Sequence, residues 1–138
     1  HVNYHFNEVV KNYNPKAIVF FCGTNDLAAL KSPAETFSDF ETFYSMVKKE
    51  LTGTKLIVIG VKPTIAREYL IKEEKEFNNL ISNLAAEDDL LTYVSVWDPM
   101  LTNEGKADPT LFVEDGLHIN AKGYEVWTKL VRSAIENL

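Results

Sequence analysis

The sequence contains a single cysteine, Cys22, which excludes an internal disulfide bond and any metal cluster built from several thiolates. It has no long apolar run, because the longest, from Ala17 to Cys22, is far shorter than the roughly 20 residues of a transmembrane helix. Basic residues are outnumbered by acidic ones, the formal net charge is −6, and no basic stripe occurs. Nucleic acids and anionic membranes bind clustered Lys and Arg, so neither is expected as a partner.

Two further absences concern the possible function and the cellular compartment. No glycine-rich phosphate loop is present, which leaves a flavodoxin-like phosphate binder without support. No secretory signal is recognisable, and the sequence predicts no particular cellular compartment. What remains is a chain of 138 residues with 46% hydrophobic and 25% charged residues, the balance of an ordinary globular protein. We therefore expect residues 1–138 to belong to a single domain.

Three short apolar segments are predicted to be strands. They span residues 17–22, 55–60 and 91–97, and they are rich in β-branched and aromatic side chains. Their apolar runs are largely continuous rather than alternating, which is typical of a parallel sheet covered on both faces.

Helical spacing of apolar residues predicts helices over residues 3–13, 33–51, 66–86 and 121–138. Ser32 and Asn120 precede two of them as N-caps. Strands that alternate with helices predict an α/β fold, a three-layer α/β/α sandwich with a flavodoxin-like parallel sheet. Ligands of such sheets bind beyond the carboxyl ends of the strands.

Asp115 and His118 lie in the long loop after the third predicted strand. Histidine suits a general base because its pKa lies near neutral pH, and it needs an acceptor on its second ring nitrogen. A carboxylate three residues upstream, with Gly116 allowing a tight turn, can supply that acceptor. The pattern alone is equally compatible with an ordinary surface loop.

Gly23, Thr24, Asn25 and Asp26 directly follow the first predicted strand. Glycine permits a sharp turn, and the Asn25 amide can donate a hydrogen bond to an oxyanion. The alternative is a turn in which Asn25 or Asp26 bonds only to backbone.

The two blocks together, Gly-Thr-Asn-Asp from residue 23 and Asp-Gly-Leu-His-Ile-Asn-Ala-Lys-Gly-Tyr from residue 115, resemble the SGNH (GDSL-type) hydrolase family in composition and order. The resemblance covers nearly the whole chain. It implies that His118 is the general base and later the general acid, that Asp115 orients it, and that Asn25 donates to the oxyanion. Gly23 shapes the loop that presents Asn25, and Asp26 belongs to the same loop.

The Gly-Asp-Ser block that supplies the family's nucleophile is absent, and none of the six serines follows a strand-ending glycine. We therefore expect residues 1–138 to be the C-terminal part of an SGNH domain that lacks its N-terminal strands. The family's sheet order, 2-1-3-4-5, predicts that the three strands present stay contiguous. The strand from Ala17 to Cys22 then becomes an open edge, which predicts self-association or pairing with an N-terminal fragment.

The resemblance implies an esterase, lipase or deacetylase that acts on small-molecule or carbohydrate esters through a serine acyl-enzyme, without metal or cofactor. The isolated chain is expected to be inactive. The alternative is a non-catalytic binding or interaction module that retains a relic of the site. Two further expectations concern the third helix and its surroundings: residues 72–76 form a solvated, charged helix face, and Arg67 either contacts substrate or pairs with a carboxylate. Trp97 is expected in the core or in a pocket wall.

Overall fold

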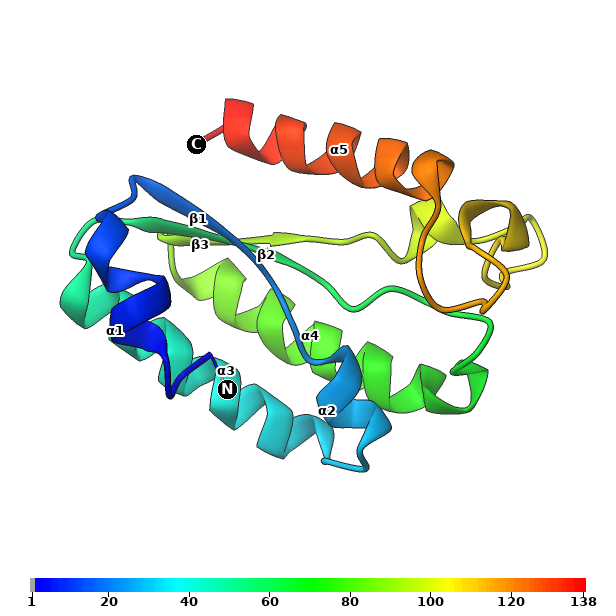
Figure 1. The fold of residues 1–138 in the computed structure, drawn as a ribbon, viewed down its shortest axis with the longest axis horizontal. Coiled ribbons are helices and arrows are strands. Elements are labelled where there is room, and N and C mark those ends of the chain that lie inside the picture. The colour runs from blue at the N-terminus through cyan, green and yellow to red at the C-terminus, as the bar shows by residue number, and fades with distance from the viewer. Residues whose placement is uncertain (1) are drawn as a thin grey trace.

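The computed structural model describes residues 2–138 and contains one parallel sheet of three strands (Figure 1). The strands are β1 (Ala17–Phe21), β2 (Lys55–Ile59) and β3 (Leu91–Val94), in the order β1-β2-β3. Both pairings are parallel, with Ala17 opposite Lys55 and Leu56 opposite Leu91. The three predicted strands and their contiguous order are confirmed, and β3 ends earlier than expected.

Helices cover both faces of the sheet. Figure 1 shows α3 (Pro33–Glu50) and α4 (Ile71–Glu87) on one face and α5 (Ala121–Glu136) on the other. A capping box between Ser32 and Glu35 begins α3, and the Asn120 side chain accepts from the Gly123 N–H to begin α5. The predicted α/β/α sandwich is therefore confirmed, as are both N-caps.

Two helices differ from their predicted bounds by more than two residues. The expected helix over residues 3–13 is reduced to α1 (Phe6–Val9) and a 3₁₀ turn at Lys11–Tyr13. Phe6 is the only buried residue of the two, so little packing supports a longer helix. The helix expected over 66–86 begins only at Ile71, because backbone groups of the preceding loop bond to other parts of the fold. A short helix, α2 (Thr24–Ala28), was not predicted.

A buried asparagine fixes the exit of β2. Asn78, on α4, donates from Nδ2 to the Val61 carbonyl at 2.9 Å and accepts from the Val61 N–H at 2.8 Å. Both backbone groups of Val61 are buried and would otherwise be unpaired. The loop that leaves β2 toward the carboxyl end of the sheet therefore starts from a defined position.

β1 is an edge strand within residues 2–138, because only β2 pairs with it. Its side chains Val19 and Phe21 are 45% and 38% exposed, although both are apolar. A groove of about 550 Å³ runs between this face of the sheet and α5. Its lining is mostly apolar: Val19, Ile59, Tyr124, Trp127, Thr128, Val131, Arg132, Ile135 and Glu136.

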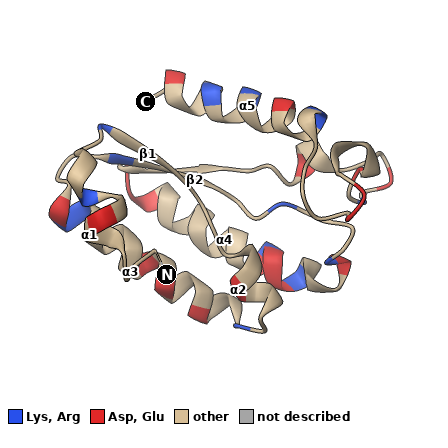
Figure 2. Cartoon of the chain, in the orientation of Figure 1, with Lys and Arg blue, Asp and Glu red and all other residues tan. Residues whose placement is uncertain are grey.

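Charged residues of both signs are interspersed along α5, whereas those of α4 gather mainly at its start (Figure 2). No helix in residues 2–138 is both long and apolar enough to span a bilayer.

Candidate active site

Asp115 and His118 are in direct contact in the loop that precedes α5. The His118 Nδ1 lies 2.6 Å from the Asp115 Oδ2. The other carboxylate oxygen, Oδ1, accepts from the backbone N–H groups of Leu117 at 2.8 Å and His118 at 2.9 Å. The hydrogen bond to His118 and these two backbone donors lower the pKa of Asp115 to about 2. The carboxylate is therefore ionised at neutral pH and holds one ring nitrogen of His118.

Gly116 joins this loop to the loop after β2. Its carbonyl accepts from the N–H groups of Ile65 and Ala66, each at 3.1 Å. Its φ of +64° lies in the left-handed region, and an added Cβ would lie 3.1 Å from the Cβ of Ile65. A side chain here would strain the backbone and crowd the contact between the two loops, so glycine is required.

The loop after β1 presents Asn25 at the same end of the sheet (Figure 1). Gly23 has a φ of +105°, and an added Cβ would lie 2.7 Å from Cε1 of Phe77. This tight turn leads into α2, where Asn25 is exposed in the first turn. The Asp26 Oδ1 lies 3.9 Å from Lys31 Nζ.

Arg67 connects the Asn25 loop to the loop that holds Gly116. Its Nη1 donates to the Thr24 carbonyl at 3.0 Å, and its Nη2 donates to the Asn25 Oδ1 at 3.1 Å. Ala66, the preceding residue, is bonded to Gly116. The segment after β2 thus bonds to both predicted site blocks, which are far apart in the sequence. The expected partner of Arg67 was either substrate or a carboxylate; within residues 2–138 its guanidinium bonds to an amide oxygen and a backbone carbonyl.

Glu74 corrects the expectation that residues 72–76 form a solvated face. Its exposure is 0%, and neither carboxyl oxygen has a hydrogen-bond partner within residues 2–138. Burial raises its pKa to about 7, although Arg67 and Lys62 nearby act in the opposite direction. Helical spacing contained the signal: Glu74 lies four residues after Leu70 and three before Phe77, both buried.

We expect Glu74→Gln to stabilise the protein at pH 8 and to change little at pH 5. The pKa of Glu74 rises from 4.5 to about 7 on folding. Between these values only the unfolded chain loses the proton, so the free energy of unfolding falls as pH rises, and above pH 7 the loss is complete. At about 1.4 kcal/mol per pKa unit, the rise from 4.5 to about 7 corresponds to roughly 3 to 4 kcal/mol. The net gain should be smaller, about 2 kcal/mol, because the buried Gln amide also lacks partners.

Urea unfolding at both pH values measures this difference. Glu76→Gln, an exposed position on the same helix, is the control and should change neither value. An equal stabilisation by Glu74→Gln at pH 5 and pH 8 would contradict a titration origin.

Cysteine and serine are the usual nucleophiles of such sites, and within residues 2–138 none of these side chains is hydrogen-bonded to His118. Burial raises the pKa of Cys22 to about 12, so its thiol stays protonated. Within residues 2–138 no serine is hydrogen-bonded to the His118 ring, whose partner is Asp115. His5, the other histidine described, contacts Glu8 at 3.1 Å, and residues 2–138 contain no cluster of three or more metal-binding side chains.

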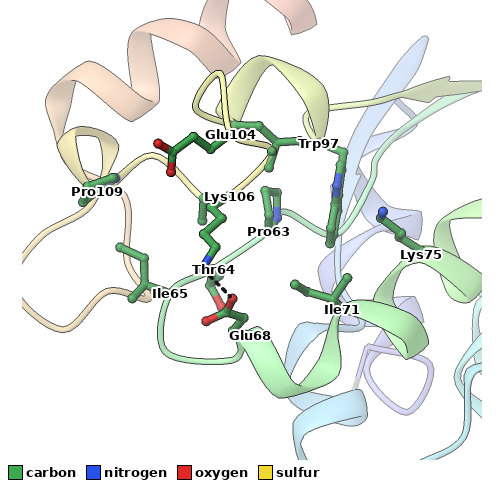
Figure 3. A pocket seen from close by; sticks show the side chains of 13 residues that line it. Pro63, Thr64, Ile65, Glu68, Ile71, Lys75, Trp97, Glu104, Lys106 and Pro109 are labelled. Carbon is green, nitrogen blue, oxygen red and sulfur yellow. Dashed lines mark ion pairs between the residues drawn. The ribbon is translucent and has the colours of Figure 1, made fainter.

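A cavity of about 490 Å³ lies between the loops that follow β2 and β3 (Figure 3). Trp97 forms one wall, with Lys75 Nζ 5.5 Å from the ring centroid, and a Glu68–Lys106 ion pair of 4.0 Å bridges it. A smaller pocket of about 400 Å³ includes Asp115 and Gly116. Both are lined by Ile65 and Pro109, so the cavity adjoins the loop that contains Asp115 and Gly116. Trp97 is thus a cavity-wall residue.

Comparison with known proteins identifies one family. The sequence profile of the GDSL-like Lipase/Acylhydrolase family matches residues 2–126, most of the chain. A curated protein of Escherichia coli, an N-acylneuraminate cytidylyltransferase, is 26% identical over 120 residues. That match covers 86% of this chain but only 28% of the E. coli protein.

Solved structures share the fold. A GDSL-like lipase from Bacteroides thetaiotaomicron superposes with a TM-score of 0.74 at 24% identity, covering 98% of this chain and 69% of that chain. A family 3 carbohydrate esterase from Talaromyces cellulolyticus gives 0.74 at 17% identity, covering 98% and 66%. The chain therefore spans about two thirds of these structures.

Proposed function

Because the chain belongs to the GDSL-like lipase/acylhydrolase family, we propose that it supplies the acid–base pair and an oxyanion donor of a serine esterase. The observation that carries the proposal is the 2.6 Å contact between His118 Nδ1 and Asp115 Oδ2, in a loop bonded through Gly116 to the segment that holds Asn25. This arrangement provides a base, the carboxylate that orients it and an amide donor at one end of the sheet.

The geometry supports the following role for each group. With Nδ1–H donated to Asp115, the Nε2 of His118 is free to take the proton of a serine hydroxyl as its oxygen bonds to the ester carbonyl carbon. The carbonyl oxygen gains negative charge, which the Asn25 amide stabilises. His118 then gives the proton to the departing alcohol. Water attacks the acyl-enzyme by the same route and releases the acid.

The nucleophile in this proposal is a serine outside residues 1–138. The support is twofold: no serine contacts the His118 ring within the described residues, and the chain spans about two thirds of the related structures. Without that serine, the isolated chain is expected to hydrolyse no ester through an acyl-enzyme.

Labelling with a fluorophosphonate tests this assignment directly, because the reagent modifies only an activated serine. In the natural full-length protein, we expect one labelled serine, outside residues 1–138, and no label after His118→Ala. A label on Ser32, Ser38, Ser45, Ser82, Ser95 or Ser133 would overturn the assignment. No labelling together with no hydrolysis of p-nitrophenyl acetate would favour the alternative, a binding module that retains a relic of the site.

Small-molecule or carbohydrate esters are the proposed substrates. The structural relatives include an enzyme named as a carbohydrate esterase, which supports this class. The net charge of −6 disfavours polyanionic substrates such as nucleic acids.

The open edge of β1 is the proposed contact with the remainder of the domain or with a second copy of this chain. The exposure of Val19 and Phe21 beside an apolar groove supports this contact. An edge strand also offers unpaired backbone groups to another strand. Light scattering distinguishes the two partners: the second-copy form requires dimers or larger assemblies of the isolated chain, and a monodisperse monomer excludes it.

A further inference from the structure

Arg67 lies where it can control the orientation of the proposed oxyanion donor. It is half-buried in the segment between β2 and α4, and its own N–H donates to Thr64 Oγ1 at 3.1 Å. Thr64 is itself 2% exposed, so the backbone at Arg67 starts from a rigid support. From there the guanidinium reaches Asn25, 42 residues earlier in the sequence.

The two contacts of the guanidinium decide which end of the Asn25 amide faces it. A guanidinium carries only donors, so its partner atom must be the Oδ1 of Asn25, the contact seen at 3.1 Å. The Nδ2 group then points away from Arg67, and within residues 2–138 it makes no hydrogen bond of its own. The second bond, from Nη1 to the Thr24 carbonyl at 3.0 Å, fixes the guanidinium against the backbone of the same turn.

The orientation of the Asn25 amide matters because an asparagine amide is nearly symmetrical in shape but opposite in polarity at its two ends. The Nδ2 group stabilises an oxyanion, whereas Oδ1 in the same place would repel it. A positive charge on Oδ1 also polarises the amide and strengthens donation from Nδ2.

We infer that Arg67 is a positioning residue that holds the Asn25 amide with Nδ2 toward the reacting carbonyl oxygen. The inference rests on the proposed esterase function and assigns a role to a residue whose partner the sequence left open. Arg67 acts through Asn25 and touches no substrate atom in this role. Its loss therefore lowers the rate of the chemical step and leaves substrate binding unchanged.

The test measures kcat and KM for p-nitrophenyl acetate in the natural full-length protein and in its Arg67→Met variant. We expect kcat to fall about tenfold with KM unchanged, and by no more than the loss caused by Asn25→Ala. Arg67→Lys, which keeps the charge but loses the fork of donors, should give an intermediate kcat. Lys129→Met removes an exposed cation of α5 that does not line the apolar groove beside β1, and is the control.

A double-mutant cycle separates positioning from general support of the fold. In the Asn25→Ala background, Arg67→Met should have no further effect on kcat, because the group that it orients is already absent. An additive loss, an unchanged kcat in the single variant, or a raised KM at constant kcat would each overturn the inference. The last result would assign Arg67 to substrate binding.

A second readout is independent of catalysis. The side-chain amide resonances of Asn25 in the ¹⁵N–¹H NMR spectrum should shift in Arg67→Met and stay in place in Lys129→Met. If the full-length protein shows no hydrolysis that depends on His118, the proposed function fails, while the NMR comparison still decides whether Arg67 holds Asn25. Unchanged Asn25 resonances in Arg67→Met would overturn the contact itself.

Discussion

Replacing His118 by alanine in the natural full-length protein is expected to lower kcat/KM for p-nitrophenyl acetate by about 10⁴-fold. The imidazole is the group in the site that can take the serine proton near neutral pH, and Asp115 cannot replace it. The variant loses the His118 hydrogen bond that lowers the pKa of Asp115 most, but even an ordinary aspartate has a pKa of about 4 and is a poor base at neutral pH. Its Oδ1 is also occupied by two backbone N–H groups. The remaining oxyanion donors leave a small residual rate above that of water.

His5→Ala provides a matched control for this experiment. His5 is also exposed and also contacts a carboxylate, Glu8, three residues away at 3.1 Å, but it lies near α1 rather than at the carboxyl end of the sheet. The control should retain the activity of the unmodified protein. Hydrolysis that survives His118→Ala at a similar rate would refute the assigned base.

Asn25→Ala should produce the second largest loss, a fall in kcat of about 10²- to 10³-fold with little change in KM. In the proposed mechanism the side-chain amide donates to charge that develops only in the transition state, so its removal should raise the barrier without weakening the binding of the neutral ester. Steady-state kinetics with p-nitrophenyl acetate measures both constants.

Asn25→Asp sharpens this prediction. The variant retains the size and shape of asparagine but replaces the donor by a negative charge, so we expect it to be at least as inactive as Asn25→Ala. Asn79→Ala, at an exposed position on α4, is the control and should be fully active. A raised KM at constant kcat in Asn25→Ala would instead assign Asn25 to ground-state binding.

Local signals in the sequence predicted the three strands and the starts of α3 and α5, whereas the order of the strands was predicted from the resemblance to the SGNH family. Continuous apolar runs identified β1, β2 and β3, and the residue types at Ser32 and Asn120 identified two N-caps, because each depends on neighbouring residues alone. The predicted start of the third helix was wrong because Ala66 bonds to Gly116, fifty residues later in the chain. A contact of that kind leaves no trace in helical periodicity.

In the candidate site, too, contacts between neighbouring residues were predictable and contacts between distant residues were not. The contact between Asp115 and His118 was predictable from their spacing, and the structure contains it. The partner of Arg67 was not, because the two contacting atoms become neighbours only when the loops after β1 and β2 meet. Glu74 was assigned to solvent because its charge was weighed above its position on the buried face of α4. The catalytic roles themselves stay predictions.

The two contacts of the site join residues at very different separations in the sequence. This difference predicts the order in which the contacts form when the chain refolds. The contact between Asp115 and His118 closes a loop of three residues, for which the entropic cost is small. The contact between Arg67 and Asn25 spans 42 residues and requires β1 and β2 to be paired. Folding rates fall as contacts become less local. The acid–base pair is therefore expected to form early and the oriented amide late, so that return of hydrolysis should track pairing of β1 with β2.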